Sequence, residues 1–128
     1  MYSKKVLERF SNPSFAGGLR GGDGTGKAES GSEVVKIYIS VDDRGEIDTI
    51  KFKAFGGVCT IVACDIACQR VEGRTLSEAL ALTPQEILDE IDIPESKHAS
   101  AHLAQEAVKL AVEDYFEKKE KELKKKSK

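Results

Sequence analysis

The chain has 128 residues and a mass of 14.0 kDa, which suffices for one domain with a single hydrophobic core. Hydrophobic residues make up 40% and charged residues 33% of the sequence, and no apolar run approaches the roughly 20 residues of a membrane-spanning helix. A membrane partner is therefore not expected. The formal net charge of −2 combines +4 from residues 117–128, which hold seven Lys and three Glu, with −6 from the rest of the chain. The acidity of the rest of the chain and its low aromatic content argue against a nucleic-acid partner.

The N-terminal part is predicted to be a short helix followed by a long loop. A helix over residues 3–10 ends at Asn12-Pro13, because the residue before a proline avoids the helical region. Residues 16–32 then hold seven of the eleven glycines, and we expect a loop there. Loops of this length are usually functional or mobile.

Alternating apolar and polar residues predict a hairpin in the middle of the chain. From Val35 to Val41 every second residue is apolar, which is the period of a half-buried strand. Turn-forming residues at 42–45 lead into a second strand over residues 46–55. We therefore expect a small antiparallel sheet that consists of this hairpin and a short third strand.

The second half of the chain is predicted to be helical. A helix over residues 59–71 ends near Gly73, and capping boxes mark two further helix starts at Thr75 and Thr83. A long amphipathic helix follows from about Ser96.

This order of elements predicts an α+β fold, in which helices pack on one face of a small antiparallel sheet and a long helix closes the chain. We expect one domain over residues 1–116 and a Lys-rich helical tail over residues 117–128.

Seven short stretches along nearly the whole chain resemble the NifU/IscU-type family of iron–sulfur cluster assembly scaffolds. In chain order they are Tyr2–Val6 with Asn12-Pro13, Asp23–Gly26, Glu33–Ile39, Ile50–Gly56, Val71–Leu76 and Leu103–Ala107. The resemblance implies the same α+β fold and a role in iron–sulfur cluster assembly. It also implies cysteine desulfurase and other assembly proteins as partners.

The ligand positions of that family are altered in this chain. The family holds a nascent [2Fe–2S] cluster or a zinc ion through three cysteines, often with an Asp and a His nearby. The cysteine positions fall on Gly31, Gly57 and Ser100, the Asp position on Glu33 and the His position on Ala99. The resemblance therefore implies a scaffold framework without the thiolates that hold iron in a cluster.

The family's motif for an Hsp70-type chaperone is altered as well. It reads Leu-Pro-Pro-Val-Lys in the family, whereas this chain has Ile93-Pro94-Glu95-Ser96-Lys97. We therefore do not expect the chaperone among the partners.

The three cysteines of this chain lie elsewhere, on the predicted helix over residues 59–71. Cys59 is expected at the head of that helix, partly exposed and favoured as a thiolate by the helix dipole, so it is either a ligand or a small apolar filler. Cys64 falls on the inward stripe of the helix and is expected to pack in the core. Cys68 lies one turn later at the border of that stripe, where the pair could also share a metal ion.

His98 and His102 also stand four residues apart on one helical face. This spacing suits one metal ion, and the family fold would bring His98 towards Glu33 and Cys59. The pattern thus allows a mononuclear zinc or iron site in place of the cluster site. The alternative is a pair of exposed polar residues in the first turn of a helix.

Enzymatic activity and nucleotide binding are not expected. The stretch Gly21–Lys27 has the spacing of a phosphate-binding loop, but Ala28 replaces the Ser or Thr that would bind Mg²⁺, and a strand follows it instead of a helix. The sequence also lacks a recognisable nucleophile with a base and an orienting group.

Two functions remain open at this point. One is a divergent scaffold that binds iron, zinc or a cluster through Cys59 and His98, with a homodimer that shares the ligands as one arrangement. The other is a cluster-free paralogue that regulates assembly by docking on the desulfurase. In both cases the cofactor is left open and the expected location is the cytoplasm.

Overall fold

The computed structural model describes residues 2–126 as one sheet with helices packed against it. In chain order the elements are α1 (Lys4–Ser11), β1 (Gly24–Ser30), β2 (Glu33–Val41), β3 (Ile47–Phe55), α2 (Val58–Val71), α3 (Leu76–Leu80), α4 (Pro84–Glu90), the short 3-10 helix η1 (Glu95–Lys97) and α5 (Ala99–Lys126). The predicted α+β class with an antiparallel sheet and a long C-terminal helix is confirmed.

The sheet has three antiparallel strands in the order β1-β2-β3. In the central strand, Ile37 pairs with Gly26 of β1 on one side and with Phe52 of β3 on the other. The predicted hairpin is therefore the β2–β3 pair. Buried residues alternate with more exposed ones along all three strands, so one face of the sheet is turned to the core and the other is not.

The expectation of a loop throughout residues 16–32 is wrong, because residues 24–30 form the edge strand β1. Its glycines serve close packing. A Cβ atom on Gly26 would collide with the backbone of Ala107 in α5, and one on Gly24 with the backbone of Ala111. The glycine content that predicted a loop therefore reflects how closely a helix lies on this strand.

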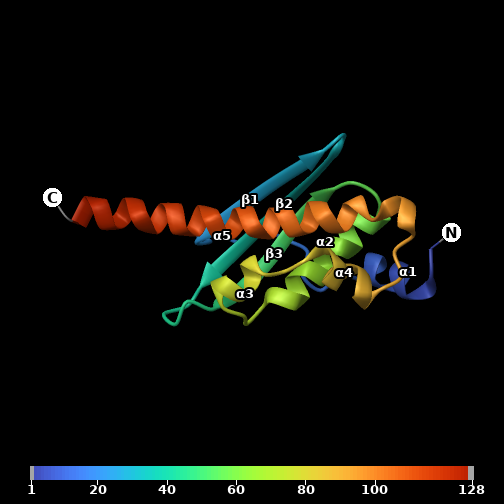
Figure 1. The fold of residues 1–128 in the computed structure, drawn as a ribbon, viewed down its shortest axis with the longest axis horizontal. Helices are drawn as coiled ribbons and strands as arrows, with labels where there is room; N and C mark the ends of the chain where they lie inside the picture. The colour runs from blue at the N-terminus through green and yellow to red at the C-terminus, as the bar shows by residue number, and fades with distance from the viewer. Residues whose placement is uncertain (1, 127–128) are drawn as a thin grey trace.

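The helices cover one face of the sheet, and α2 forms the centre of the core. Helix α5 crosses in front of β1 and β2 and continues beyond the sheet, while α2 packs beside it (Figure 1). Ten of the 14 residues of α2 are buried, which is far more than the single stripe of an ordinary surface helix. The core thus closes around α2 on nearly all its sides.

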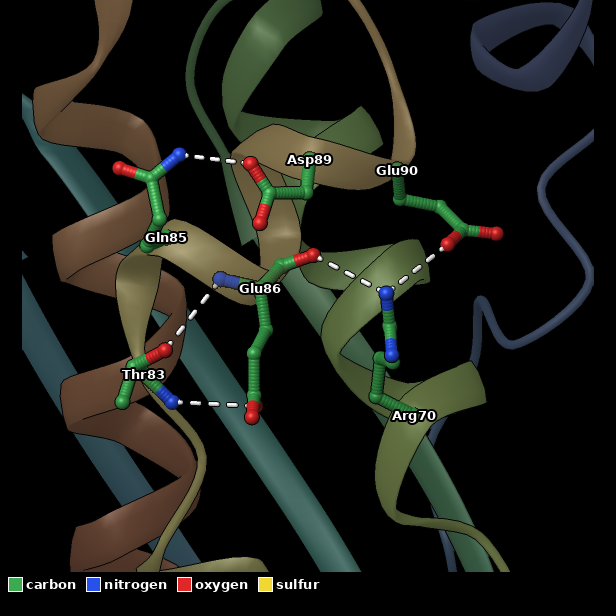
Figure 2. A network of polar contacts seen from close by, with 6 residues as sticks. All are labelled: Arg70, Thr83, Gln85, Glu86, Asp89 and Glu90. Atoms are coloured by element: carbon green, nitrogen blue, oxygen red, sulfur yellow. Dashed lines mark hydrogen bonds and ion pairs between the residues drawn. The ribbon is translucent and has the colours of Figure 1, made fainter.

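Helix α4 begins with the predicted capping box and is held to α2 by one arginine. The side chain and backbone of Thr83 exchange hydrogen bonds with Glu86 (Figure 2). Arg70 of α2 donates to the carbonyl of the same Glu86 at 3.3 Å and, at the other end of α4, to the Glu90 carboxylate at 3.0 Å (Figure 2). These contacts fix the short helix against the core.

The last helix begins three residues later than predicted and includes most of the basic tail. Pro94 is followed by the 3-10 turn η1, in which Lys97 N–H donates to the Pro94 carbonyl at 2.8 Å, and α5 starts only at Ala99. Within the tail predicted over residues 117–128, the described part up to Lys126 is helical, and residues 127–128 lie outside the described range. Within residues 2–126, no helix combines the length and apolar character needed to span a bilayer.

Candidate functional site

The three altered ligand positions meet at one cavity at the end of the sheet. Gly31 comes from the β1–β2 turn, Gly57 from the loop between β3 and α2, and Ser100 from the first turn of α5. Together they line a cavity of about 710 Å³. Glu33 and Cys59 line the same cavity. The cavity thus forms where the β1–β2 turn and the end of β3 lie beside the starts of α2 and α5, which are far apart in the sequence.

The carboxylate of Glu33 caps the start of α2. Gly57, the N-cap residue of α2, makes no side-chain cap of its own, and its N–H donates to Glu33 Oε2 at 2.9 Å. The Thr60 hydroxyl donates to the same oxygen at 2.6 Å. These hydrogen bonds, first from Thr60 and then from Gly57, lower the pKa of Glu33, and the charge of Lys97 acts in the same direction while burial opposes it. Glu33 is therefore a well-stabilised anion at a helix N-terminus.

Ser100 extends this contact to the last helix. Its hydroxyl oxygen is buried and lies 3.3 Å from Thr60 Oγ1. The resulting Glu33–Thr60–Ser100 network joins β2, α2 and α5 through protein atoms alone. Gly31 lies just before β2, Gly57 just before α2 and Ser100 on α5, so the network links the elements that adjoin the three altered ligand positions.

Gly31 and Gly57 differ in their backbone conformation and in the space around an added side chain. At Gly57 the backbone is extended, with φ −77° and ψ −179°, and the nearest atom to an added Cβ would be Glu33 Oε2 at 3.9 Å. Gly31 has open space around it but a φ of +60°, in the left-handed region that favours glycine. A side chain at position 57 would thus be accommodated, whereas one at position 31 would be strained.

Cys59 lines the cavity but is not the exposed thiolate that was expected. It is only 2% exposed, because it packs into the core at the first turn of α2. Burial raises the pKa of the Cys59 thiol, although a hydrogen bond with Tyr2 and the charge of Lys97 act in the opposite direction. The prediction that Cys59 is partly exposed and favoured as a thiolate is wrong.

Cys64 and Cys68 lie inside the core. Both side chains are completely buried, so Cys68 is not the half-buried border residue that was expected. Desolvation raises the pKa of both thiols, and nearby acidic groups, Asp65 for Cys64 and Cys64 itself for Cys68, raise it further. Both are neutral thiols that fill the core.

The two histidines lie outside the cavity. His98 is half-buried, with Nε2 at 3.1 Å from the Ile93 carbonyl oxygen, and His102 is exposed on α5. Within residues 2–126, no three His, Cys, Asp or Glu side chains are grouped so that they could hold a metal ion. The structure therefore does not bring His98 together with Glu33 and Cys59.

Two residues of the site were not identified from the sequence. Thr60 lies on the otherwise apolar inward stripe of α2 and Lys97 in the altered chaperone motif, and neither was assigned to the site. A buried hydroxyl on an apolar stripe needs a hydrogen-bond partner. For Thr60, this requirement was the feature of the sequence that could have indicated a polar site.

Comparison with known proteins finds relatives that are named as iron–sulfur cluster assembly scaffolds. The profile of the family described as "NifU-like N terminal domain" matches residues 1–122. The iron–sulfur cluster assembly scaffold protein IscU of Haemophilus influenzae is 35% identical over 119 residues, which cover 89% of this chain and 94% of the relative. IscU of Azotobacter vinelandii is 36% identical over 123 residues, which cover 92% and 96%.

The solved structures agree on the fold. The crystal structure of the N-terminal part of a NifU-like protein from Brucella abortus superposes with a TM-score of 0.71 at 20% sequence identity, and covers 91% of this chain and 94% of that one. The extent of the profile match and the identity to two scaffolds lead to one conclusion: the chain belongs to the NifU-like N-terminal domain family.

Proposed function

We propose that this chain serves iron–sulfur cluster assembly as a cluster-free interaction protein, which keeps the shape of a scaffold but does not hold the nascent cluster. The observation that carries the proposal is the composition of the cavity. The three positions that would supply thiolates hold Gly31, Gly57 and Ser100. Two glycines and a hydroxyl do not fit a cluster, since iron in such clusters is held by thiolate sulfur.

The bonding of Glu33 supports the same proposal. Its carboxylate is the one anionic group that lines the cavity, and one of its oxygens already accepts two hydrogen bonds from Gly57 and Thr60. A metal ion bound there would compete with contacts that cap α2. The Glu33–Thr60–Ser100 network thus gives this end of the molecule an internal connection that requires no metal.

The partner we propose is the cysteine desulfurase or another protein of the assembly machinery. Relatives that cover nearly the whole chain are named as assembly scaffolds, which gives the context. Phe55 lines the rim of the cavity and is 76% exposed, which makes it the most exposed large apolar side chain of residues 2–126. Exposed aromatic side chains at a concave site are typical anchors of protein interfaces. The Hsp70-type chaperone is not part of the proposal, because its motif is altered at residues 93–97.

A second candidate function is metal or cluster binding through unusual ligands. It is favoured by the fact that Glu33 and Cys59 line the same cavity, so that two chains in a homodimer could pool these groups. Against it stands the burial of Cys59, which raises the pKa of its thiol.

The experiment that separates the two is anaerobic reconstitution with iron and sulfide, followed by visible absorption and metal analysis of the unaltered chain and of Cys59→Ser. The Haemophilus influenzae scaffold serves as a positive control. We expect this chain to remain colourless and free of metal. A stable chromophore that disappears in Cys59→Ser would support the second candidate instead.

Docking is measured separately, by titrating purified desulfurase with the unaltered chain, with Phe55→Ser and with Phe116→Ser. Phe116 is a matched control because it is also exposed but lies on α5 away from the cavity lining. We expect Phe55→Ser to weaken binding by roughly tenfold or more, as for an interface anchor, and Phe116→Ser to leave it unchanged. Absence of desulfurase binding by the unaltered chain would contradict the choice of this partner.

A further inference from the structure

The face of the sheet that is turned away from the core carries an unbroken row of lysines. In the strand register, Lys27 of β1 pairs with Lys36 of β2, and Lys36 pairs with Lys53 of β3. All three side chains are exposed. Cβ atoms of directly opposed residues on one face lie about 4.5–5.5 Å apart, and like charges in such pairs are destabilising. The row therefore concentrates positive charge at a cost to the folded state.

The next row of the same face adds to this surface. There Tyr38 of β2 pairs with Lys51 of β3, and both side chains are partly exposed. Leu19 and Arg20, from the loop before β1, line a hollow of about 300 Å³ together with Tyr38 and Lys53. We call this surface the basic sheet face, and define it by Arg20, Lys27, Lys36, Tyr38, Lys51 and Lys53.

The basic sheet face is only slightly neutralised by the chain itself. Lys27 Nζ forms an ion pair with Glu29 Oε1 at 2.9 Å. Among the ion pairs of residues 2–126, none involves Lys36, Lys51 or Lys53. The face is thus strongly positive, although the whole chain has a formal net charge of −2.

We infer that the basic sheet face binds an acidic segment of a partner protein. Carboxylates laid along the lysine row would relieve the repulsion among Lys27, Lys36 and Lys53, and Tyr38 with the hollow beside it offers an apolar contact. None of the residues that define the face lines the cavity between β1, α2 and α5, so the inference is argued from other side chains than the proposed function.

Charge and composition favour a protein over a nucleic acid as the occupant. Single-stranded nucleic acid is usually bound by several stacking aromatic side chains, and phosphates are well matched by arginine. The face offers one arginine, Arg20, and one partly buried aromatic ring, Tyr38. A polyanion that extended beyond the face would also meet a chain that is acidic outside its basic tail.

The first test measures binding of a fluorescein-labelled 12-residue Glu-rich peptide by fluorescence anisotropy at low salt. The variant Lys36→Glu/Lys53→Glu changes the face, and Lys121→Glu/Lys125→Glu makes the same charge change on the exposed tail of α5. We expect the sheet variant to weaken binding by about fivefold or more and the tail variant by less than about twofold. Equal losses in both variants, or no binding to the unaltered chain, would overturn the inference.

Two alternative occupants are tested in the same series. A 12-nucleotide oligo-dT that binds more tightly than the peptide and is lost in Lys36→Glu/Lys53→Glu would assign the face to nucleic acid and overturn the inference. Sedimentation analysis of the unaltered chain is expected to show no self-association through this face. Self-association that disappears in the same variant would assign the face to a second copy of the chain and would also overturn it.

A second readout follows from the repulsion within the row. Replacing the central lysine, as in Lys36→Gln, removes a like charge from both neighbouring pairs. We therefore expect Lys36→Gln to raise the Tm at low salt, and the rise to vanish at about 0.5 M salt, where charges are screened within a few ångström. The same variant should weaken peptide binding. A lowered Tm that does not respond to salt would show that Lys36 only packs on the sheet.

Discussion

The cavity end of the molecule and the central helix α2 differ in their cysteines. The cavity has the arrangement of a ligand site, with Gly31, Gly57 and Ser100 converging from three segments, but no accessible thiol. Helix α2 has three thiols, and each is buried. Three cysteines within ten residues suggest a metal site on α2, whereas the altered ligand positions converge at the cavity, where the cysteines are missing. Position and exposure decide what a thiol does, more than its presence does.

The same comparison shows how each region is held together. The cavity end relies on directional polar contacts, in which the Glu33 carboxylate and the Thr60 hydroxyl are the central groups. The core around α2 relies on close packing of side chains such as Cys64 and Ile66, both completely buried. Charge and pH should therefore affect the first region, and changes in volume or polarity should affect the second.

The strongest test of the comparison is to move thiols into the cavity with the variant Gly31→Cys/Gly57→Cys/Ser100→Cys. We expect it to retain about one equivalent of zinc after dialysis, since three convergent thiolates and a nearby carboxylate form a complete tetrahedral set. The unaltered chain, which already has three buried thiols, is the matched control and is expected to retain none. The backbone at Gly31, with a φ of +60°, should make the metal-free variant about 1–3 kcal/mol less stable. A variant that folds but takes up no zinc would contradict the convergence of the three positions.

The variant Cys64→Ser probes the dry core. It places a hydroxyl at a position that is 0% exposed, and we expect a loss of about 1–3 kcal/mol in the free energy of unfolding, measured with urea. Cys64→Ala is the control, because it removes the sulfur without adding a polar group. If the serine variant were as stable as the alanine variant, the environment of Cys64 would not be apolar.

The variant Glu33→Gln probes the polar contacts of the cavity end. It retains the size of the side chain and removes the charge that faces Gly57 N–H and the Thr60 hydroxyl. We expect a loss of about 0.5–1.5 kcal/mol in the free energy of unfolding, together with faster hydrogen exchange of the first amides of α2. Glu29→Gln, in an exposed ion pair with Lys27, is the matched control and should change stability by less than about 0.5 kcal/mol. Unchanged exchange at the start of α2 would contradict the capping role.

The smallest expected effect is the dependence of this contact on pH. Because the pKa of Glu33 is lowered below 4.5 in the folded chain, its contribution is complete above that unfolded value and is lost as the pH falls through the folded pKa. The difference in stability between the unaltered chain and Glu33→Gln should therefore shrink as the pH is lowered below about 4.5. Urea titrations at several pH values measure it. A difference that persists at a pH well below that range would point to packing instead of charge.

Much of the fold could be predicted because its signals are local. The alternation from Val35 to Val41 gave the central strand, and the capping boxes at Thr75 and Thr83 gave two helix starts. A short third strand was expected without a position, and residues 24–30, which form it, were assigned to a loop because their glycines are explained only by the backbone of α5, about 80 residues away in the sequence. No local pattern contains that contact.

The positions of the cavity could be predicted, but its interactions could not. The resemblance assigned Gly31, Gly57 and Ser100 to the altered ligand positions, and the structure places all three on one cavity. The burial of Cys59 was missed because a helix start is usually exposed, and here other parts of the chain cover it. The Glu33–Thr60 hydrogen bond joins residues 27 positions apart, and sequence spacing alone does not show it.

The dependence of β1 on α5 has a consequence for the order in which the chain matures during its synthesis. Gly24 and Gly26 pack against the backbone of residues 107–111, and the N–H of Thr25 donates to Asp114 Oδ2 at 2.8 Å. These partners leave the ribosome long after β1 itself. The edge of β2 in the nascent β2–β3 hairpin should therefore stay unpaired until α5 has emerged. We expect the first strand of the protein to be among the last parts to settle, and the N-terminal third to be the stretch most accessible to ribosome-associated chaperones.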